Sequence, residues 1–579
     1  MRFLSLLPAV LTAGFAFAQS SADAFIAKEG PIAKAGLLAN IGPSGAKSQG
    51  AQAGVVIASP SATDPPYLFT WTRDSALVFQ AIIEQVISGT DTSLRPHIDN
   101  YVRSQTILQQ VSNPSGTVSS GGLGEPKFNI DLTAFTGAWG RPQRDGPALR
   151  SIALINWANH LLATNNASYV TNSLWPIIKL DLDYVANSWN LTGFDLWEEV
   201  NSASFFTTAV QHRSLRQGAA LAQAIGQTGV VAGYTTQADN ALCFLQSYWN
   251  PSGNFMTANT GGGRSGRDSN TVLTSIHTFD AEAGCDAATF QPCSDKALAN
   301  LFVYVNAFRS IYTVNSGIPA NQAVATGRYP EDSYFGGNPW YLSTLAVAEQ
   351  LYDALIIWNK QGSLTVTAVS QPFFASLSPG VAVGTYAAST STFTTLTSAV
   401  KTFADGFVTK VAQFTPSNGG LSEQYDRNDG HPLSAVDLTW SYAAALTAFA
   451  ARDGKTPVSW GASGLTVPTT CERNTSPGGG GGGSSVSVTF NVQATTFFGE
   501  NIFLTGSVDA LQNWSPDNAI ALNADNYPIW SVTVSVPANT RIEYKFIRKF
   551  NGAVTWESDP NRVINTPAPG SFIENDTWR

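Results

Sequence analysis

Three glutamates stand in settings that suit proton transfer. Glu198 and Glu199 directly follow Trp197, and both an apolar ring and a like charge raise the pKa of a carboxyl group. Glu423 lies in a stretch that begins with two glycines. A raised pKa keeps a carboxyl protonated as a general acid near neutral pH, while an ionised carboxylate serves as a base. Cleavage of a glycosidic bond needs such a pair, with one group on each side of the sugar.

Each glutamate also has a simpler explanation. Acidic residues are favoured at the N-terminus of a helix, and a helix is predicted to begin near Asn201. Glu423, taken alone, fits an ordinary surface loop. A similar choice applies to two groupings of Arg, Asp and aromatic residues, around Arg73–Asp74 and Arg328–Asp332. They suit the binding of several sugar hydroxyls at once, or they are structural ion pairs.

The overall charge disfavours several classes of partner. The chain carries 32 Lys and Arg against 41 Asp and Glu, a net charge of −9, and only 13% of its residues are charged. No basic field exists to attract nucleic acid or an anionic membrane, so we expect neither as a partner. Its 15 Trp and 17 Tyr suit an uncharged ligand, because aromatic faces stack on the apolar faces of sugars, although most such rings fill cores.

The N-terminus predicts secretion. Met1–Arg2 precede an apolar run that ends in Ala16-Phe17-Ala18, which is the pattern of a secretory signal peptide over residues 1–18. A membrane anchor fits less well, because the run is shorter than the roughly 20 residues that a spanning helix needs. We therefore expect an extracellular protein that is not held in a membrane.

The four cysteines of a secreted chain predict two disulfides, for which three pairings exist. Cys285 and Cys293 are near enough in sequence to close one short loop, which leaves Cys243 with Cys471. Closing the longer loop is worth about 4 kcal/mol in the chain-entropy model. A secreted chain also offers sequons for N-glycosylation, here at Asn166, Asn190, Asn474, Asn513 and Asn575.

Helical periodicity dominates from about residue 73 to residue 452. In residues 73–88, apolar side chains fall into two adjacent i, i+4 rows, which give a wide buried face. Similar segments recur near residues 97–112, 146–163, 171–188, 201–225, 236–249, 295–311, 339–359, 392–413 and 435–451. Many helices with long connections on one side predict a ring of paired helices whose loops form a site at one end.

The C-terminal part of the chain has a different pattern. Residues 472–485 contain six consecutive glycines and are predicted to be a flexible linker. Beyond it, Val486–Phe490, Val532–Val536 and Ile542–Phe546 alternate strictly, which is typical of half-buried strands. Residues 486–579 therefore predict a small all-β module, a sandwich.

Other patterns for cofactor, metal or serine chemistry are weak. Gly261–Gly266 fits G-x-G-x-x-G, but no strand is evident before it, so we interpret it as a loop rather than a phosphate site. The five histidines make no paired metal spacing, and the chain contains no G-x-S-x-G elbow. We therefore expect no cofactor and no metal.

The large domain resembles the fungal glucoamylases, the inverting, starch-hydrolysing enzymes of glycoside hydrolase family 15. The matching stretches include WTRDSAL at Trp71, GLGEPKFN at Gly122, WGRPQRDGPALR at Trp139, DLWEEVNSASFFTTAVQHR at Asp195, GRYPEDSYFGGNPWY at Gly327 and LSEQYDRNDG at Leu421. The resemblance runs from about residue 22 to residue 471. It implies a mainly α protein whose catalytic domain, residues 19–471, is an (α/α)6 barrel of six inner and six outer helices.

The resemblance also implies roles for single residues. Glu198 would be the general acid, and Glu423 would be the base that activates water. The residues implied for holding the terminal glucose units and shaping the pocket are Tyr67, Trp71, Arg73, Asp74, Trp139, Leu196, Trp197, Glu199, Arg328, Asp332, Trp340 and Trp440. Inversion requires room for a water, so we predict roughly 6.5–9.5 Å between the two carboxyl groups. The implied substrates are starch and maltooligosaccharides, and we expect a monomer.

The C-terminal module resembles the starch-binding domain that often follows such enzymes, a carbohydrate-binding module of family 20. This resemblance rests on FGENIFLTG at Phe498, YKFIRK at Tyr544 and WESDPNR at Trp556. It implies one glucan site of Trp514, Lys545, Trp556 and Asn561, and a second of Tyr527 and Trp530. The second site departs from the family pattern, because Phe498 stands where relatives commonly have Tyr and the segment around Tyr527 is shortened.

Two other kinds of protein share parts of this pattern. A non-catalytic glucan-binding protein would keep the β module and lose activity in the helical ring, but the carboxylate pair is intact here. Helical-ring enzymes of other specificity, such as trehalases and polysaccharide lyases, are nearer alternatives. A lyase needs a base, often Tyr, beside a group that neutralises a uronic acid, and the acidic loops here suit a neutral sugar instead.

Overall fold

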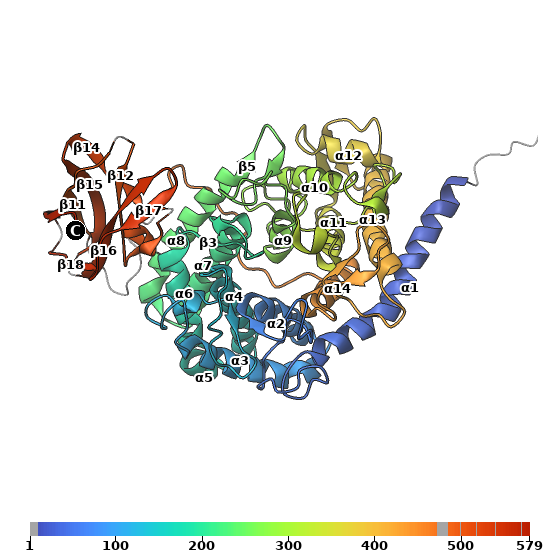
Figure 1. Cartoon of the computed structure of the whole chain (residues 1–579). Coiled ribbons are helices and arrows are strands. Elements are labelled where there is room, and N and C mark those ends of the chain that lie inside the picture. Colours follow the sequence, from blue (N-terminus) through green and yellow to red (C-terminus); the bar gives the residue numbers. More distant parts are fainter. Residues whose placement is uncertain (1–9, 472–484, 498, 517, 539, 569) are drawn as a thin grey trace, which may run out of the picture. The chain divides into compact units, whose positions relative to one another are not determined.

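A computed structural model describes residues 10–471, 485–497, 499–516, 518–538, 540–568 and 570–579 (Figure 1). The chain forms two units, which divide between Glu472 and Arg473. Residues 1–9 of the predicted signal peptide, residues 472–484 of the predicted linker with the sequon at Asn474, and Phe498 lie outside the described residues. Residues 10–18 belong to the first helix, α1 (Val10–Ala39).

Six helices form a closed inner ring within residues 10–471 (Figure 1). They are α2 (Thr72–Ile87), α4 (Asp145–Ala163), α7 (Phe205–Ala224), α9 (Asn270–His277), α11 (Tyr341–Gln361) and α14 (Thr439–Arg452). Each helix packs against the next in this order, and α14 packs against α2. The ring is therefore continuous.

Six outer helices in the same part of the chain cover this ring. They are α1, α3 (Arg95–Gln110), α6 (Trp175–Ser188), α8 (Val231–Leu245), α10 (Asp295–Ala307) and α13 (Ser391–Phe414). Helix α3 packs on α2, α6 on α4, α8 on α7, α10 on α9, α13 on α11 and α1 on α14. The predicted (α/α)6 barrel is confirmed. Two short helices, α5 (Ala167–Tyr169) and α12 (Gln371–Leu377), lie in the connections.

Local sequence explains where several of these helices begin and end. Ser294 and Thr390 precede α10 and α13, and each hydroxyl oxygen accepts a backbone N–H of the first turn. Gly362 follows α11 in a left-handed conformation, which glycine adopts without the Cβ penalty of other residues. Helix α11 is buried without interruption from Tyr341 to Leu355, because α9, α14 and α13 all pack against it.

Most predicted helices agree in place with observed ones, but the start at Asn201 is wrong. Residues Asn201–Ser202 form strand β4, which pairs with β3 (Gly193–Phe194), and α7 begins only at Phe205. Helices α1 and α9 have no counterpart among the predicted segments. Helix α9 has eight residues, too few for a clear apolar period, although it completes the inner ring.

Short antiparallel strand pairs anchor the loops of the first unit. Besides β3 with β4, they are β1 (Thr70–Trp71) with β2 (Lys127–Phe128), β5 (Trp249–Asn250) with β6 (Phe255–Met256), β7 (Ser363–Val366) with β8 (Gly384–Ala387) and β9 (Gln424–Tyr425) with β10 (Pro432–Leu433). Trp71 lies in β1, Glu198 between β3 and β4, and Glu423 directly before β9. Paired backbone thus fixes the segments that carry the predicted chemistry.

Two disulfides join residues of the first unit. Cys243–Cys471 links α8 to the end of the unit, and Cys285–Cys293 closes the loop before α10. These are the pairings that the sequence spacing favours.

The second unit consists of two β-sheets around a core of its own (Figure 1). One sheet has the strand order β14-β15-β11-β19, and the other has β13-β12-β16-β17, with β18 also paired to β16. The strands are β11 (Ser485–Gln493), β12 (Asn501–Gly506), β13 (Ile520–Ala521), β14 (Asn523–Asn526), β15 (Ile529–Pro537), β16 (Arg541–Phe550), β17 (Ala553–Trp556), β18 (Arg562–Asn565) and β19 (Gly570–Thr577). Alternate residues of β11, from Val486 to Val492, are buried. The predicted all-β sandwich is confirmed.

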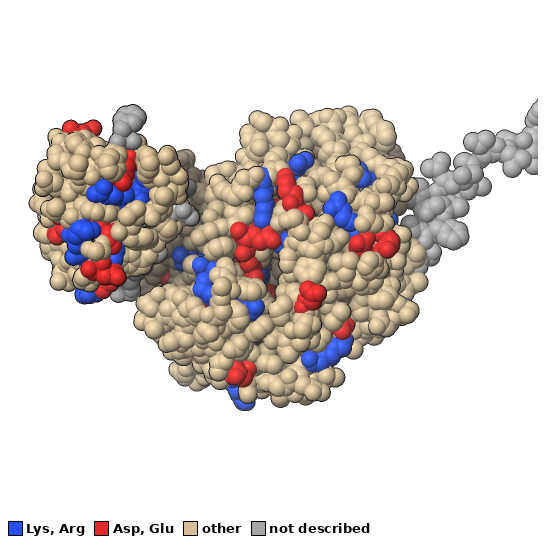
Figure 2. Space-filling view, in the orientation of Figure 1, with Lys and Arg blue, Asp and Glu red and all other residues tan. Residues whose placement is uncertain are grey.

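The surface is sparsely charged on the face that Figure 2 shows. Lys and Arg there lie in small groups, often beside Asp and Glu, and most of the visible surface carries neither. Within the described residues, no helix combines the length and the apolar character that crossing a membrane requires.

Candidate active site

Glu198 lies in the loop that connects β3 to β4. Asp195 is fully buried and closes this loop, because its Oδ1 accepts the backbone N–H groups of Glu199 (3.0 Å) and Val200 (3.2 Å). Glu198 has a φ of 66°, a left-handed conformation that is uncommon for residues with a side chain. Such backbone strain persists only where the surroundings fix it, and it clusters at functional sites.

Glu198 and Glu199 turn to different partners. Glu198 Oε1 accepts hydrogen bonds from Trp71 Nε1 (2.6 Å) and from Arg73 Nη2 (3.2 Å). Glu199 Oε1 instead lies 2.9 Å from Arg328 Nη2. The two adjacent carboxylates are therefore paired with different arginines, Glu198 with Arg73 and Glu199 with Arg328.

Arg73 connects the site to the inner ring. It is the second residue of α2 and is 5% exposed, and its Nη1 donates to Gln143 (2.8 Å) and Asp145 (3.0 Å). Its Nε lies 3.6 Å from Asp74. Burial raises the pKa of Asp74 to about 6, although the charge on Arg73 opposes this. The structure thus places the predicted Arg73–Asp74 pair beside Glu198.

Glu423 is held in a second strand-anchored loop. Its backbone N–H donates to the carbonyl of Ala435 (2.8 Å), directly before β9 begins. The carboxylate is 1% exposed, and its Oε2 accepts hydrogen bonds from Gln424 (2.9 Å) and Ser434. Burial raises the pKa of Glu423, and the hydrogen bonds from Ser434 and Gln424 oppose that rise. Glu423, the carboxyl group expected to act as the base, is thus shielded from water.

Tyr67 lies close to both carboxyl groups. Burial raises the pKa of Tyr67 well above its ordinary value, and the charges on Glu423 and Glu198 add to the rise. Its hydroxyl lies 2.9 Å from that of Tyr334, in the short helix η7 (Tyr334–Gly336). The Tyr67 ring packs 5.5 Å from that of Trp71, whose indole binds Glu198, and the Tyr67 hydroxyl contacts Glu423, so the two loops bring both carboxyl groups into one site.

Arg328, which pairs with Glu199, lies among several aromatic rings. Its guanidinium is bidentate to Asp332, with Nε at 2.8 Å and Nη2 at 2.6 Å from the two carboxylate oxygens. The side chain is 3% exposed and lies within 5.5 Å of the ring centres of Trp197, Tyr334 and Trp340. Because Arg forms two parallel bonds to a carboxylate, this pair is geometrically fixed.

Tryptophan rings pack beside the charged side chains of the site. Trp71 packs edge-on against Trp139 at 5.9 Å, and Trp197 packs against Trp340 at 5.5 Å and stacks with Trp440 at 6.3 Å. The indole N–H groups of Trp139 and Trp340 are buried, and no described residue accepts a hydrogen bond from them. Leu196, also predicted here, is 1% exposed.

Four side chains at the site were not among the predicted residues. Tyr334 bonds to Tyr67, while Arg264 and Tyr329 both bind Glu199. Lys127 lies 3.5 Å from the ring centre of Trp139, and burial lowers its pKa to about 8. Tyr329 and Tyr334 lie in the stretch GRYPEDSYFGGNPWY, and Lys127 lies in GLGEPKFN. Because both stretches carry the family resemblance, these three residues could have been predicted from them. Arg264 comes from the loop that the sequence had shown only as a glycine-rich pattern.

The β module brings together several residues of the first predicted glucan site. Lys545 Nζ donates to the carbonyl of residue 557, directly after Trp556, at 3.2 Å. Asn561 binds Glu543, two residues before Lys545 on β16, at 2.9 Å. Trp556 is 40% exposed, and Trp514, at the end of the short helix η8 (Asp509–Trp514), is half-buried.

The second predicted glucan site is only partly formed. Tyr527 is 52% exposed, and its hydroxyl lies within 3.4 Å of the backbone of Thr496. Trp530 is 5% exposed, because its ring packs in the core of the module and its Nε1 donates to the carbonyl of Ala494 (3.1 Å). The predicted glucan-binding role of Trp530 stays a prediction: its ring packs in the core, and Tyr527 is the exposed member of the pair.

One group of side chains has the spacing of a metal site. Asp426, Asp429 and His431 place one ligand atom each within 4.8 Å of one another, at the surface. The imidazole of His431 is already bonded to Asp429 at 2.6 Å, and that contact raises the pKa of His431. Exposed acidic clusters of this kind are common without an ion, so the group carries no argument for a metal.

Comparison with known proteins defines the class. Residues 31–450 match the model of glycosyl hydrolases family 15, and residues 485–575 match that of a starch binding domain. The chain belongs to glycosyl hydrolases family 15. It is 65% identical to Glucoamylase-1 of Schizophyllum commune over 97% of this chain and 96% of that one, and 48% identical to a glucoamylase of Neurospora crassa over 96% and 94%.

A solved structure agrees with these sequence relatives. The family 15 glucoamylase from Hypocrea jecorina is 50% identical, with a TM-score of 0.76, over 96% of this chain and 100% of that chain. The family resemblance seen in the sequence is confirmed.

Proposed function

We propose that the chain is a secreted, exo-acting glucoamylase that releases β-D-glucose from the non-reducing ends of starch and maltooligosaccharides by single-step inversion, with α-1,4 bonds cleaved faster than α-1,6 bonds. The main support is geometric: Glu198 binds Trp71, whose ring packs 5.5 Å from Tyr67, Tyr67 contacts Glu423, and tryptophan and arginine side chains surround these groups. The glucoamylase relatives in glycosyl hydrolases family 15 point the same way.

The two carboxyl groups divide the chemistry. Glu198 gives its proton to the glycosidic oxygen as the bond from that oxygen to the anomeric carbon breaks. A water attacks the anomeric carbon from the other face, and its proton passes to Glu423. The water needs a gap of roughly 6.5–9.5 Å between the carboxyl groups, and this separation stays a prediction.

The remaining side chains hold the sugar. Arg73, Asp74, Glu199, Arg328 and Asp332 would bind hydroxyl groups of the terminal glucose units. The free indole N–H groups of Trp139 and Trp340 offer two more hydrogen bonds. The rings of Tyr67, Trp71, Trp197 and Trp440, with Leu196, would shape the pocket.

The parts of the chain would act separately. Residues 1–18 direct secretion, residues 19–471 hydrolyse, residues 472–485 form a tether, and residues 486–579 adsorb to starch through the site of Trp514, Lys545, Trp556 and Asn561. The run of six glycines in the sequence between them supports this division. We expect a monomer with no cofactor.

Hydrolysis of soluble starch, followed by anomeric proton NMR, tests the proposal. We expect β-glucose as the first product and its slow conversion to the anomeric mixture. Glu198→Gln and Glu423→Gln should each abolish most of the release while adsorption to starch persists. Initial α-glucose would contradict inversion, and adsorption without any sugar release would favour a binding protein instead.

A further inference from the structure

The loop of residues 259–268 packs against the loop that carries Glu198. The backbone N–H of Thr260 donates to the carbonyl of Ala203 at 3.0 Å. Gly262, at a φ of 92°, approaches Val200 so closely that a Cβ at this glycine would lie 2.7 Å from the valine side chain. Only glycine combines that backbone conformation with this approach, so the two loops form one packed unit.

Asp268, the last residue of the 259–268 loop, holds the residue before Glu198. Trp197 Nε1 donates to Asp268 Oδ1 at 2.8 Å, and the same oxygen accepts the backbone N–H of Asn270 at 2.8 Å. Asp268 is 2% exposed, and burial raises its pKa to about 7. Since a protonated carboxyl keeps its carbonyl oxygen as an acceptor, this contact can persist in acid.

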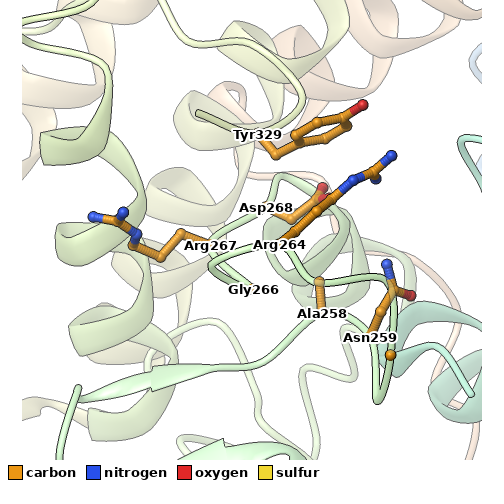
Figure 3. Close-up of a pocket in the computed structure, with 8 residues that line it drawn as sticks. Ala258, Asn259, Arg264, Gly266, Arg267, Asp268 and Tyr329 are labelled. Carbon is orange, nitrogen blue, oxygen red and sulfur yellow. The ribbon is translucent and has the colours of Figure 1, made fainter. Parts of the chain in front are cut away.

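Arg264, from the middle of the same loop, holds the residue after Glu198. Its Nη2 binds the carboxylate of Glu199, and its guanidinium lies 3.7 Å from the ring centre of Tyr329, whose hydroxyl binds Glu199 as well. Figure 3 shows Arg264 running toward the tyrosine ring with Asp268 beside it, while Arg267 points away to the other side. Arg264, Asp268 and Tyr329 line one small pocket.

Within the described residues, the Glu198 carboxylate forms no hydrogen bond or ion pair with the 259–268 loop. Its carboxylate is bonded to Trp71 and Arg73, while both of its neighbours in sequence are fixed from the side of the 259–268 loop. Its left-handed backbone allows little freedom. A rotation of the peptide group before or after Glu198 would therefore move its carboxyl group relative to a bound sugar.

We propose that Asp268 and Arg264 are positioning residues that aim the Glu198 carboxyl at the glycosidic oxygen, an inference that rests on the proposed function. Neither supplies a proton to the reaction. They act through Trp197 and Glu199, in the way that an outer layer of hydrogen bonds holds catalytic groups in place. Because misplacement by about 1 Å costs up to about 10²-fold in rate, their loss should appear mainly in kcat.

Variants at Asp268 test the first contact. We expect Asp268→Ala to lower kcat on soluble starch about 10-fold or more, to change KM less, and to move the alkaline limb of the kcat profile, which reports the proton donor. Asp268→Asn keeps an oxygen that accepts the indole bond and should restore most of kcat. Arg267→Gln, in the same loop but pointing away, is the matched control and should match the wild type.

Two further variants separate positioning from general damage. Trp197→Phe removes the indole donor, so adding Asp268→Ala to this variant should lower kcat little further. If the double variant instead lost kcat by the product of the two single losses, the proposal would be overturned. Arg264→Met should likewise lower kcat while starch adsorption and the melting temperature stay near wild type. A pure loss of melting temperature, with unchanged kcat and pH profile, would leave only a structural role.

The proposed function can fail separately from this inference. Wild-type protein that releases no glucose would overturn the function itself. Active wild type with equally active Asp268→Ala and Arg264→Met would overturn only the positioning role.

Discussion

The two units place their candidate sugar-binding rings at different depths. In the helical unit, Trp71, Trp197, Trp340 and Trp440 are each 7% exposed or less. In the β module, Trp556 is 40% exposed. Bond breaking needs groups that are fixed in advance and shielded from water, whereas adsorption to a polymer needs only accessible rings. The depth of a ring therefore indicates which of the two tasks it serves.

Some buried carboxyl groups of the helical unit, unlike those around Arg562 in the β module, have no cationic partner in the part of the chain that the structure describes. In the β module, Arg562 lies between Glu557 (2.6 Å) and Asp576 (2.5 Å), and its charge is compensated. In the inner ring of the helical unit, Glu349 and Asp353 of α11 are at most 8% exposed, and no Lys or Arg of the described residues forms an ion pair with them. Ionising such buried groups costs free energy, so the stability of the helical unit should depend on pH.

The largest expected effect concerns the base. Glu423→Gln keeps the shape of the side chain but removes its capacity to take a proton from water. We expect kcat on soluble starch to fall about 10²–10⁴-fold, the usual contribution of a general acid or base. Steady-state release of glucose measures the fall.

Adsorption to granular starch is the control for this variant. If the units divide hydrolysis and adsorption as their ring depths suggest, the Glu423→Gln protein should adsorb like the wild type. Loss of adsorption together with activity would break the comparison.

The sequence predicts the fold and the site to different extents. The helical segments and the alternating strands are visible because apolar periods of 3.6 and 2 are local properties. Glu198 and Glu423 stand 225 positions apart, and neither motif alone favours catalysis over a helix terminus or a surface loop. Their pairing follows from the resemblance, and in the structure Tyr67, which the resemblance also implies, lies near both.

Other features could not be read from local sequence because they depend on tertiary contacts. The role of Arg264 arises from the packing of residues 259–268 against the β3–β4 loop, which a glycine-rich pattern does not reveal. The indole N–H of Trp530, a residue predicted to bind glucan, donates to the carbonyl of Ala494 in the core. An aromatic residue in a strand has the same pattern whether it faces a ligand or the interior.

Arg328 offers the next largest effect. Lysine keeps the positive charge but lacks the planar fork that binds both oxygens of Asp332. Since a hydrogen bond to a charged group is worth about 1.5–3 kcal/mol, we expect Arg328→Lys to lower kcat/KM about 10–100-fold on maltose and on soluble starch. An unchanged kcat/KM would show that the fixed geometry of the Arg328–Asp332 pair is not needed for hydrolysis. That result would weaken the contrast between the buried site and the exposed ring of the β module.

Glu349 tests the response of the ring interior to pH. Burial raises its pKa to about 8 from an ordinary value of 4.5, although Thr447 donates a hydrogen bond to it. Burial and the charge of Glu349 raise the pKa of Asp353, and burial raises that of Glu84 to about 7 against the charge of Arg213. The native state thus binds more protons than the unfolded chain between about pH 4.5 and 8, so stability falls as pH rises through this range.

Glu349→Gln should remove part of this pH dependence. The free energy of unfolding of the wild type should fall from pH 4 to pH 8. We expect that fall to be smaller in the variant by at least about 1.4 kcal/mol, the equivalent of one pKa unit. Chemical unfolding at several pH values, followed by a signal of the helical unit, measures the difference. Glu282→Gln, at a carboxylate whose side chain is 63% exposed, is the control, and an equal difference there would show that the effect is not one of burial.

Trp556 gives the smallest expected effect and isolates the β module. Removing one exposed aromatic contact typically costs about 1 kcal/mol or somewhat more, so Trp556→Ala should weaken adsorption to granular starch about 10-fold. Hydrolysis of soluble starch should not change, because the ring has no part in the buried site. Val554→Ala, two residues earlier on the same face of β17 and 37% exposed, removes apolar surface without an aromatic ring. If Val554→Ala weakened adsorption as much as Trp556→Ala, general apolar contact rather than stacking on sugar faces would account for binding, and exposure of a ring would no longer identify its task.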